Sequence, residues 1–275
     1  MKRFLVFFLV LVLGAGFAAA QDVGLTVGLE FGLGNVGKAY GGDVAPYLMP
    51  MLIYENAFID GALDLYGELD YTLGFSKELN AKGEEVLPQS LYIDLSVGYN
   101  LSLGDASTLS FILENQFDTI ELSPSDLVTG IFTPAIRFNQ GFDDFGDIYV
   151  QVGFPITYFP NVKDADTSTG LDSTIGWSSS FGLGLEAIVY TLIAPSEAAG
   201  YVGFETTVSY ENDAVYCELN AYFPSDIKAE GITITPEFDY SFGSLTAYLF
   251  IEFAGIGSDG GEVVITPAIG IKYSF

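Results

Sequence analysis

Apolar and polar residues alternate along most of this chain, most clearly at its C-terminal end. In residues 263–275 one parity is mostly polar or small. The other parity holds Val263, Ile265, Pro267, Ile269, Ile271, Tyr273 and Phe275. A period of two residues predicts a β-strand with one apolar face.

Similar segments recur along the chain, separated by turn-like residues, and no convincing amphipathic helix lies between them. Many span 10 or more residues, which is the length of a tilted membrane-crossing strand and about twice the average in soluble proteins. The predicted strands are 23–33, 44–54, 58–73, 91–103, 109–119, 127–138, 148–159, 175–191, 201–210, 215–223, 232–240, 245–253 and 263–275.

Charged residues in these strands fall on the parity opposite to the apolar series. In segment 58–73, Leu65 and Leu69 share one parity and Glu68 lies on the other. Because Lys or Arg at a lipid-facing midplane costs about 2–4 kcal/mol, we expect the apolar parity to face lipid and the charged parity to line a polar lumen. The lumen-lining candidates are Asp64, Glu68, Asp70, Asp94, Glu114, Arg137, Glu186, Glu218, Glu237, Asp239, Glu252 and Lys272.

Polar exceptions on the apolar parity include Asn115, Ser179 and Thr206. On the same assignment Leu249 faces lipid, and Arg is expected to be tolerated better at its lumenal neighbour Tyr248. A soluble sandwich with one wet face would also segregate charges. Strand length and the export signal described next argue against that alternative.

The first 20 residues form a predicted secretory signal peptide. Lys2 and Arg3 precede the apolar run 4–13, and three alanines end at Ala20. This order of basic, apolar and small residues is typical of a cleavable signal. The apolar run is too short to cross a bilayer as a helix, which needs about 20 residues. The predicted mature chain, residues 21–275, enters the periplasm.

An alternating last strand that ends in an aromatic residue, with Tyr273 before Phe275, resembles the closing strand of bacterial outer-membrane β-barrels. The resemblance implies that the barrel-assembly machinery reads Tyr273 and Phe275, and that the barrel is embedded in outer-membrane lipid. It also implies an all-β fold: one closed antiparallel transmembrane up-and-down β-barrel over 21–275. An even strand count with both termini in the periplasm is the rule for this class.

The thirteen segments therefore leave the strand count open, and we expect 12 strands, with 14 as the alternative. Periplasmic turns are predicted at 55–57, 104–106, 211–214 and 242–244, and outer loops at 74–90 and 160–174. The miscount should lie between about residues 120 and 200, near Pro-containing stretches. Pro134, Pro236 and Pro267 lie on apolar parities, and we expect them at bulges or strand starts.

Composition excludes several functions. After residue 20 the chain keeps 36 acidic and 7 basic residues, a formal charge of 7 − 36 = −29, so nucleic acid is not a predicted partner. With Cys217 alone, no internal disulfide can form. The chain contains no His, on which the outer-membrane barrel enzymes depend, and we predict no enzymatic activity.

No metal site or cofactor is predicted either. Acidic residues alternate in 164–172 as in a calcium loop, but the Gly is one place late and no Glu closes the segment. Asp143, Asp144 and Asp147 form a second acidic group. We interpret both groups as solvated loop acids.

Two functions remain. The first is a passive diffusion channel for small solutes or cations, with small inward residues leaving room for water: Gly24, Gly28, Gly32, Ser178, Ser180, Gly182 and Gly184. The acidic lumen predicts a preference for cations. The second is a plugged barrel at the cell surface, acting as an adhesin or anchor.

Overall fold

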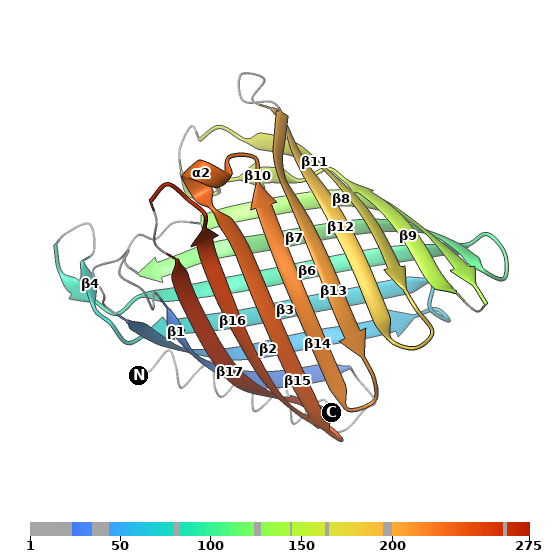
Figure 1. Ribbon diagram of the computed structural model, residues 1–275, viewed down its shortest axis with the longest axis horizontal. Helices are drawn as coiled ribbons and strands as arrows, with labels where there is room; N and C mark the ends of the chain where they lie inside the picture. Colours follow the sequence, from blue (N-terminus) through green and yellow to red (C-terminus); the bar gives the residue numbers. More distant parts are fainter. Residues whose placement is uncertain are drawn as a thin grey trace.

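The computed structural model describes residues 24–34, 44–79, 83–123, 128–143, 145–162, 165–194, 200–260 and 263–275. They form one closed antiparallel β-barrel (Figure 1). The predicted signal peptide lies outside the described residues. The barrel strands are β1 (Leu25–Gly34), β2 (Ala45–Phe58), β3 (Leu63–Gly74), β6 (Gln89–Ser102), β7 (Ser107–Ser123), β8 (Val128–Phe142), β9 (Gly146–Gly153), β10 (Ile156–Tyr158), β11 (Ser168–Ser178), β12 (Leu183–Ala194), β13 (Gly200–Glu211), β14 (Val215–Pro224), β15 (Ile232–Phe242), β16 (Leu245–Ile256) and β17 (Val264–Ser274).

The barrel has 14 strand positions, which is the alternative count and not the preferred 12. Consecutive strands are neighbours, and β9 and β10 together occupy the position between β8 and β11. The sheet closes where β1 pairs with β17, from Thr26↔Ser274 to Gly32↔Ala268. The hairpin β4 (Glu78–Leu79) and β5 (Glu85–Val86) and the short helix α2 (Ile227–Glu230) lie in connections.

The two ends of the barrel differ in their connections. Tight turns at 59–62, 103–106, 179–182, 212–214 and 243–244 lie at the end where β1 begins and β17 finishes. The longer connections, including 75–88 and 225–231, lie at the opposite end. We call these the short-turn end and the loop end. In the described part of the chain, no helix is long and apolar enough to cross a membrane.

The error in the strand count lies in the predicted strand 175–191, because this region contains parts of two strands, β11 and β12. Ser179–Gly182 forms the turn between them, where Ser179 Oγ accepts from the Leu183 N–H at 2.8 Å. Gly182 has φ 93°, and a Cβ there would lie 1.9 Å from the Glu211 carbonyl oxygen. Only glycine fits this turn. The missing strand end therefore lies at a serine–glycine turn and not at a proline.

Other boundaries shift by a few residues. Residues 55–57 belong to β2, and its turn follows at 59–62. The turn at 104–106 is confirmed. The outer loop predicted over 160–174 is shorter, because β11 already begins at Ser168.

The three prolines lie inside strands and not at strand starts, so that part of the prediction was wrong. Pro134 pairs regularly with Leu113 of β7. On its other side lies the break between β9 and β10, where the Phe154 N–H donates to the Pro134 carbonyl at 3.0 Å. Because a strand residue directs its N–H and C=O toward one neighbour, a proline disturbs the ladder on one side only.

Pro236 and Pro267 follow the same rule. Pro236 pairs with Leu219 of β14 but is skipped in the β15–β16 ladder, whose register is unchanged across the gap. Pro267 pairs with Ile251 of β16 and lies just beyond Ala268, the last residue of β17 that pairs with β1. Each proline therefore has one regular neighbour and one interruption.

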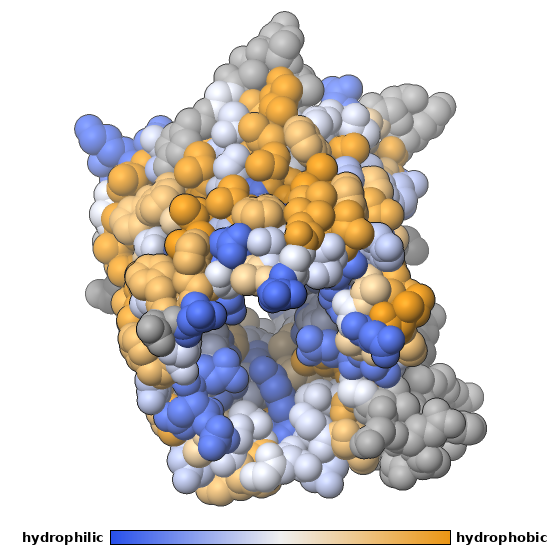
Figure 2. Space-filling model, turned by 90° about the vertical axis from the view of Figure 1, so that its right-hand side faces the viewer, coloured by the Kyte–Doolittle hydropathy of each residue, from blue (hydrophilic) through white to orange (hydrophobic). Residues whose placement is uncertain are grey.

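The outer surface of the barrel is hydrophobic and the inner surface is hydrophilic. Figure 2 shows hydrophobic residues over the outside and an opening surrounded by hydrophilic residues. In β16, Leu249 is 41% exposed on the outside, whereas its neighbour Tyr248 is 6% exposed on the inside. The alternation read from the sequence thus separates two environments.

Candidate functional site: the barrel lumen

Two large cavities lie inside the barrel, both toward the short-turn end. The first has a volume of about 1040 Å³ and is lined by β2, β3 and β6–β9. The second, of about 990 Å³, is lined by β1, β2 and the β11–β17 wall. Glu55 of β2 lines both.

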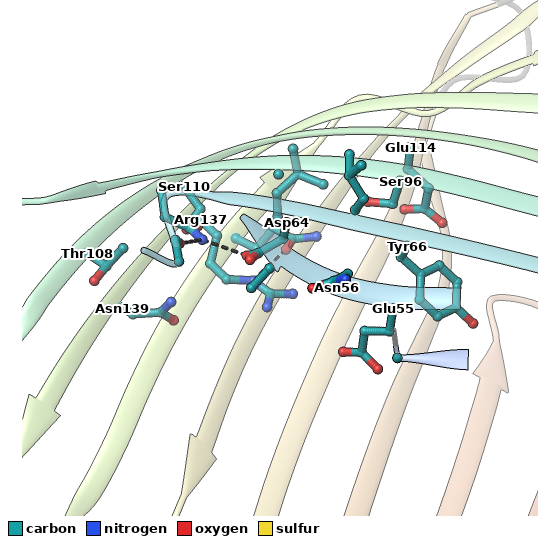
Figure 3. A pocket seen from close by; sticks show the side chains of 18 of the residues that line it. Glu55, Asn56, Asp64, Tyr66, Ser96, Thr108, Ser110, Glu114, Arg137 and Asn139 are labelled. Carbon is teal, nitrogen blue, oxygen red and sulfur yellow. Dashed lines mark hydrogen bonds between the residues drawn. The ribbon is translucent and has the colours of Figure 1, made fainter. Parts of the chain in front are cut away.

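The first cavity brings together four of the predicted lumen residues: Asp64, Asp94, Glu114 and Arg137. Figure 3 labels Asp64, Glu114 and Arg137. The four residues come from four different strands, β3, β6, β7 and β8. They line one cavity because each occupies the inward parity of its strand. Asn100 Nδ2 donates to Asp64 Oδ2 at 2.6 Å. Amide and hydroxyl groups thus support the carboxylates here.

Among the residues that the structure describes, no carboxylate lies within salt-bridge distance of Arg137. Its Nε donates to Gln151 Oε1 at 2.8 Å, and its guanidinium lies 4.7 Å from the centre of the Tyr149 ring. An arginine over an aromatic face keeps its full charge. The carboxylates of this cavity therefore have no bound counterion in the described part of the chain.

The second cavity contains the predicted lumen residues Asp239 and Lys272. The Lys272 ammonium lies 4.5 Å from the centre of the Tyr248 ring. Like Arg137, it contacts an aromatic face and not a carboxylate. Across the described ranges the ion pair found is Lys77–Glu85 at 2.8 Å, and it lies on the β4–β5 hairpin.

Glu30 is the centre of the most buried polar group in the barrel. It is 3% exposed and accepts hydrogen bonds from the Tyr47 hydroxyl at 2.9 Å and the Tyr248 hydroxyl at 2.8 Å. Met51, 4% exposed, packs beside them. The group joins β2 to β16 across the closing β1–β17 pair.

Tyrosine hydroxyls hold other lumenal carboxylates in the same way. Tyr66 donates to Glu68 at 2.6 Å, and Tyr216 donates to Glu218. A neutral hydroxyl satisfies a carboxylate oxygen without cancelling its charge. Sequence reasoning missed this role of the tyrosines, although Tyr66 lies on the polar parity of its strand.

Two of the glycines expected to leave room for water, Gly28 and Gly32, instead receive side chains. A Cβ at Gly32 would lie 2.1 Å from the Tyr47 ring, and one at Gly28 would lie 2.5 Å from Met51. Tyr248 lies in the same manner over Gly270, its direct cross-strand partner. Ser180 and Gly182 belong to a turn and not to a strand wall. The small residues therefore let rings lie flat against the wall.

The remaining predicted residues also occupy inward parities. Glu186 follows the outward Leu185, which is 45% exposed, and Glu237 precedes the outward Phe238, which is 46% exposed. Glu252 shares its parity with Tyr248. Asp70, Asp94 and Asp239 each have one buried carboxylate oxygen without a hydrogen-bond partner among the described residues.

Asp172 is an inner acid that the sequence assigned to a loop. It lies in β11, where it pairs with Gly153 of β9 and Tyr190 of β12. Its parity opposes the outward Ile175, which is 56% exposed. The inward position of Asp172 could therefore be predicted from its parity, but only if β11 was known to begin at Ser168.

The acidic segments do not assemble into a metal centre in the described part of the chain, where no group of three His, Cys, Asp or Glu could hold a metal ion. Asp144 and Asp164 lie outside the described residues. Asp172, the last acidic residue of the calcium-like segment, lies in β11 of the barrel wall.

The C-terminal strand is fully integrated into the sheet. The Phe275 N–H donates to the Leu25 carbonyl at 2.9 Å. The Tyr273 and Phe275 rings meet edge to face at 4.9 Å and are 44% and 41% exposed on the outer surface. The two aromatic residues thus form an outward pair at the short-turn end.

No protein-family model and no curated protein matches this sequence. Among solved structures, CdiB from Acinetobacter baumannii is 10% identical over 93% of this chain and 60% of that chain, with a TM-score of 0.50. A triple mutant of Rhodopseudomonas blastica porin is 8% identical over 92% of this chain and 100% of that chain, with a TM-score of 0.46. The chain thus shares the closed antiparallel β-barrel fold with CdiB.

Proposed function

We propose that this protein is a passive diffusion channel of the bacterial outer membrane that prefers cations. Residues 1–20 would direct export and be removed near Ala20, and residues 21–275 would form the barrel in outer-membrane lipid. The barrel-assembly machinery would recognise Tyr273 and Phe275. The solutes would be small molecules or cations that cross without chemical change.

The charge of the inner wall carries this proposal. Over the described ranges its basic residues are Arg137 and Lys272, and both contact aromatic rings. Acidic side chains that line a narrow pore attract cations, because the low-dielectric wall focuses their electric field. In the described part of the chain the inner acids include Glu30, Glu55, Asp64, Glu68, Asp70, Asp94, Glu114, Asp172, Glu186, Glu205, Glu218, Glu237, Asp239 and Glu252.

The width of the barrel is compatible with this function. Barrels of about 8 strands are filled by side chains, and those of about 16–18 strands contain open aqueous channels. With 14 strands, this barrel approaches the open class. Its cavities of about 1040 and 990 Å³ offer room for water and hydrated ions.

We propose no enzymatic role. The chain lacks His, and the lumenal acids recur at intervals of two residues along the strands, as expected for the wet wall of a barrel. Glu68 and Asp70 illustrate this spacing on β3, and Asp64 lies on the same parity.

A second candidate is a non-conducting surface or structural protein. The packing of Glu30, Met51 and Tyr248 favours it, because these side chains are only 3%, 4% and 6% exposed and are closely packed on the inner wall. In this alternative the barrel would be an anchor or adhesin that presents its loop end to partners.

Planar-bilayer recording tests the proposal. Purified barrel should give stable unit currents, and the reversal potential in a KCl gradient should show cation selectivity that weakens at high salt because of screening. The combined variant Glu68→Gln, Asp70→Asn, Asp94→Asn should lower the selectivity. Glu85→Gln, on the exposed β4–β5 hairpin, is the matched control and should leave it unchanged. Anion selectivity, or no current from correctly folded protein, would defeat the proposal and favour the anchor.

A further inference from the structure

A smaller cavity at the loop end of the lumen has a different chemical character from the two large ones. Its volume is about 350 Å³, within the range of small-molecule sites. Its lining includes Pro155, Leu192 and the rings of Tyr190 and Tyr222. The two rings meet edge to face, with centroids 6.2 Å apart. An apolar and aromatic surface therefore faces the lumen here.

Two carboxylates, those of Asp172 and Glu205, also line this cavity. Glu205 is already held, because Tyr190 Oη donates to Oε2 and Asn220 Nδ2 donates to Oε1, each at 2.6 Å. No hydrogen bond to the Asp172 carboxylate is found among the described residues. Neither Arg137 nor Lys272 lines the cavity. Asp172 thus presents a carboxylate to the pocket without a counterion among the described residues.

We propose that this pocket binds organic ammonium ions that carry an apolar or aromatic group. The ammonium would contact the Asp172 carboxylate, and the apolar group would lie against Leu192, Pro155 and the tyrosine rings. Tyrosine rings also attract an adjacent cation through their faces. The inference deepens the proposed function, on which it rests, by naming the solute class that is retained at the loop end.

The lining favours such a solute over the other charged classes. An inorganic cation is best held by several oxygen ligands, whereas this pocket combines one free carboxylate with apolar side chains. An anion would meet two negative charges with no basic residue to balance them. A neutral sugar could stack on a tyrosine, but it would leave the charge of Asp172 uncompensated.

Calorimetry on the full barrel in detergent micelles tests binding independently of conduction. The probe is benzylammonium, and benzyl alcohol is the uncharged match of similar shape. We expect binding of benzylammonium alone. Asp172→Asn should weaken it about tenfold, the size of a lost charged contact. Tyr222→Leu should weaken it severalfold through loss of the ring.

Two further variants separate local chemistry from misfolding. Asp60→Asn makes the same chemical change in the turn 59–62, at the far end of the barrel, where φ is 54° and Asn is well tolerated. It should leave benzylammonium affinity unchanged. Tyr190→Phe keeps the ring but removes its hydroxyl, so it should retain most of the binding. Heat-modifiable gel migration checks that each variant is folded.

Bilayer recording then separates this inference from the channel proposal. Benzylammonium added at the loop end should interrupt the potassium current, with events shortened about tenfold in Asp172→Asn. A conducting barrel that does not bind benzylammonium, or that binds benzyl alcohol or glucose equally well, overturns the ammonium site and leaves the channel. Binding that depends on Asp172 in a barrel that never conducts supports the site and overturns the channel.

Discussion

The outer and inner faces of the same strands meet two different environments and satisfy them in different ways. On β16, the outward Leu249 is 41% exposed, and the inward Tyr248 is 6% exposed with its hydroxyl on Glu30. The outer face avoids charge because lipid cannot solvate it. The inner face keeps its carboxylates and supplies tyrosine hydroxyls as donors. Tyrosine hydroxyls and amide groups thus hold inner carboxylates by hydrogen bonds, and no salt bridge is found on this wall among the described residues.

The polar exceptions on the outer face follow the rule that a lipid-facing polar group needs an internal partner. Asn115 Oδ1 accepts from the Tyr158 hydroxyl at 2.9 Å, and both residues lie on outward parities. Thr206 Oγ1 donates to the Glu186 carbonyl at 3.1 Å. Ser179 is not an exception, because it belongs to a turn. These residues are therefore tolerated outside because their hydrogen bonds are made within the protein.

The largest expected effect concerns the outward aromatic pair of β17. Deletion of Phe275 removes its ring contact with Tyr273 and its backbone hydrogen bond to Leu25. We expect most of the protein to fail insertion, measured as heat-modifiable barrel in outer-membrane fractions. Phe275→Tyr keeps an aromatic end and should insert normally. Wild-type levels of the deletion variant would show that the assembly machinery does not need this residue.

The next effect contrasts Arg on the two faces of β16. Leu249→Arg places a charge in lipid and should lower the free energy of unfolding by about 2–4 kcal/mol. Thr246→Arg enters the cavity of about 990 Å³ and should cost less than about 1 kcal/mol. Tyr248 is no longer a suitable tolerant site, because it is packed over Gly270 and bonded to Glu30. Equal losses for Leu249 and Thr246 in reversible unfolding would contradict the assignment of faces.

A third effect tests the inner hydrogen bonds. Glu30→Ala leaves the hydroxyls of Tyr47 and Tyr248 without their acceptor, which should lower the free energy of unfolding by about 1–3 kcal/mol. Glu30→Gln retains one acceptor oxygen and should lose less. Glu252→Ala, also on the inner face, serves as the control and should change stability little. Denaturant titration in lipid vesicles measures the free energy of unfolding of all three variants. If Glu30→Ala is as stable as Glu252→Ala, the hydrogen bonds to Glu30 do not stabilise the barrel.

The smallest effect concerns the polar pair on the outer face. Tyr158→Phe leaves the Asn115 amide without its partner and should cost about 1 kcal/mol. The double variant Asn115→Leu, Tyr158→Phe removes both polar groups, so it should regain that stability or exceed the wild type. Reversible unfolding of the two variants measures the difference. If the double variant is the less stable of the two, the pair does more than satisfy a polar group in lipid.

The sequence by itself determined the alternation of faces, because a period of two is a local property of an extended chain. Every charged candidate from Asp64 to Lys272 could be placed on the polar parity without knowledge of its neighbours. Strand length and the terminal Phe275 then pointed to a membrane barrel. The inner position of Glu30 and Glu205 was equally readable, although nothing in the sequence ranked them above other acids.

Only the tertiary structure decided the strand number and the partners of the inner acids. Ser179–Gly182 turns tightly because Gly182 adopts φ 93° against the Glu211 carbonyl, a contact with another hairpin that local pattern does not contain. The pairing of Glu30 with Tyr248 joins residues 218 positions apart. It exists because the barrel closes between β1 and β17, and closure is a property of the whole sheet.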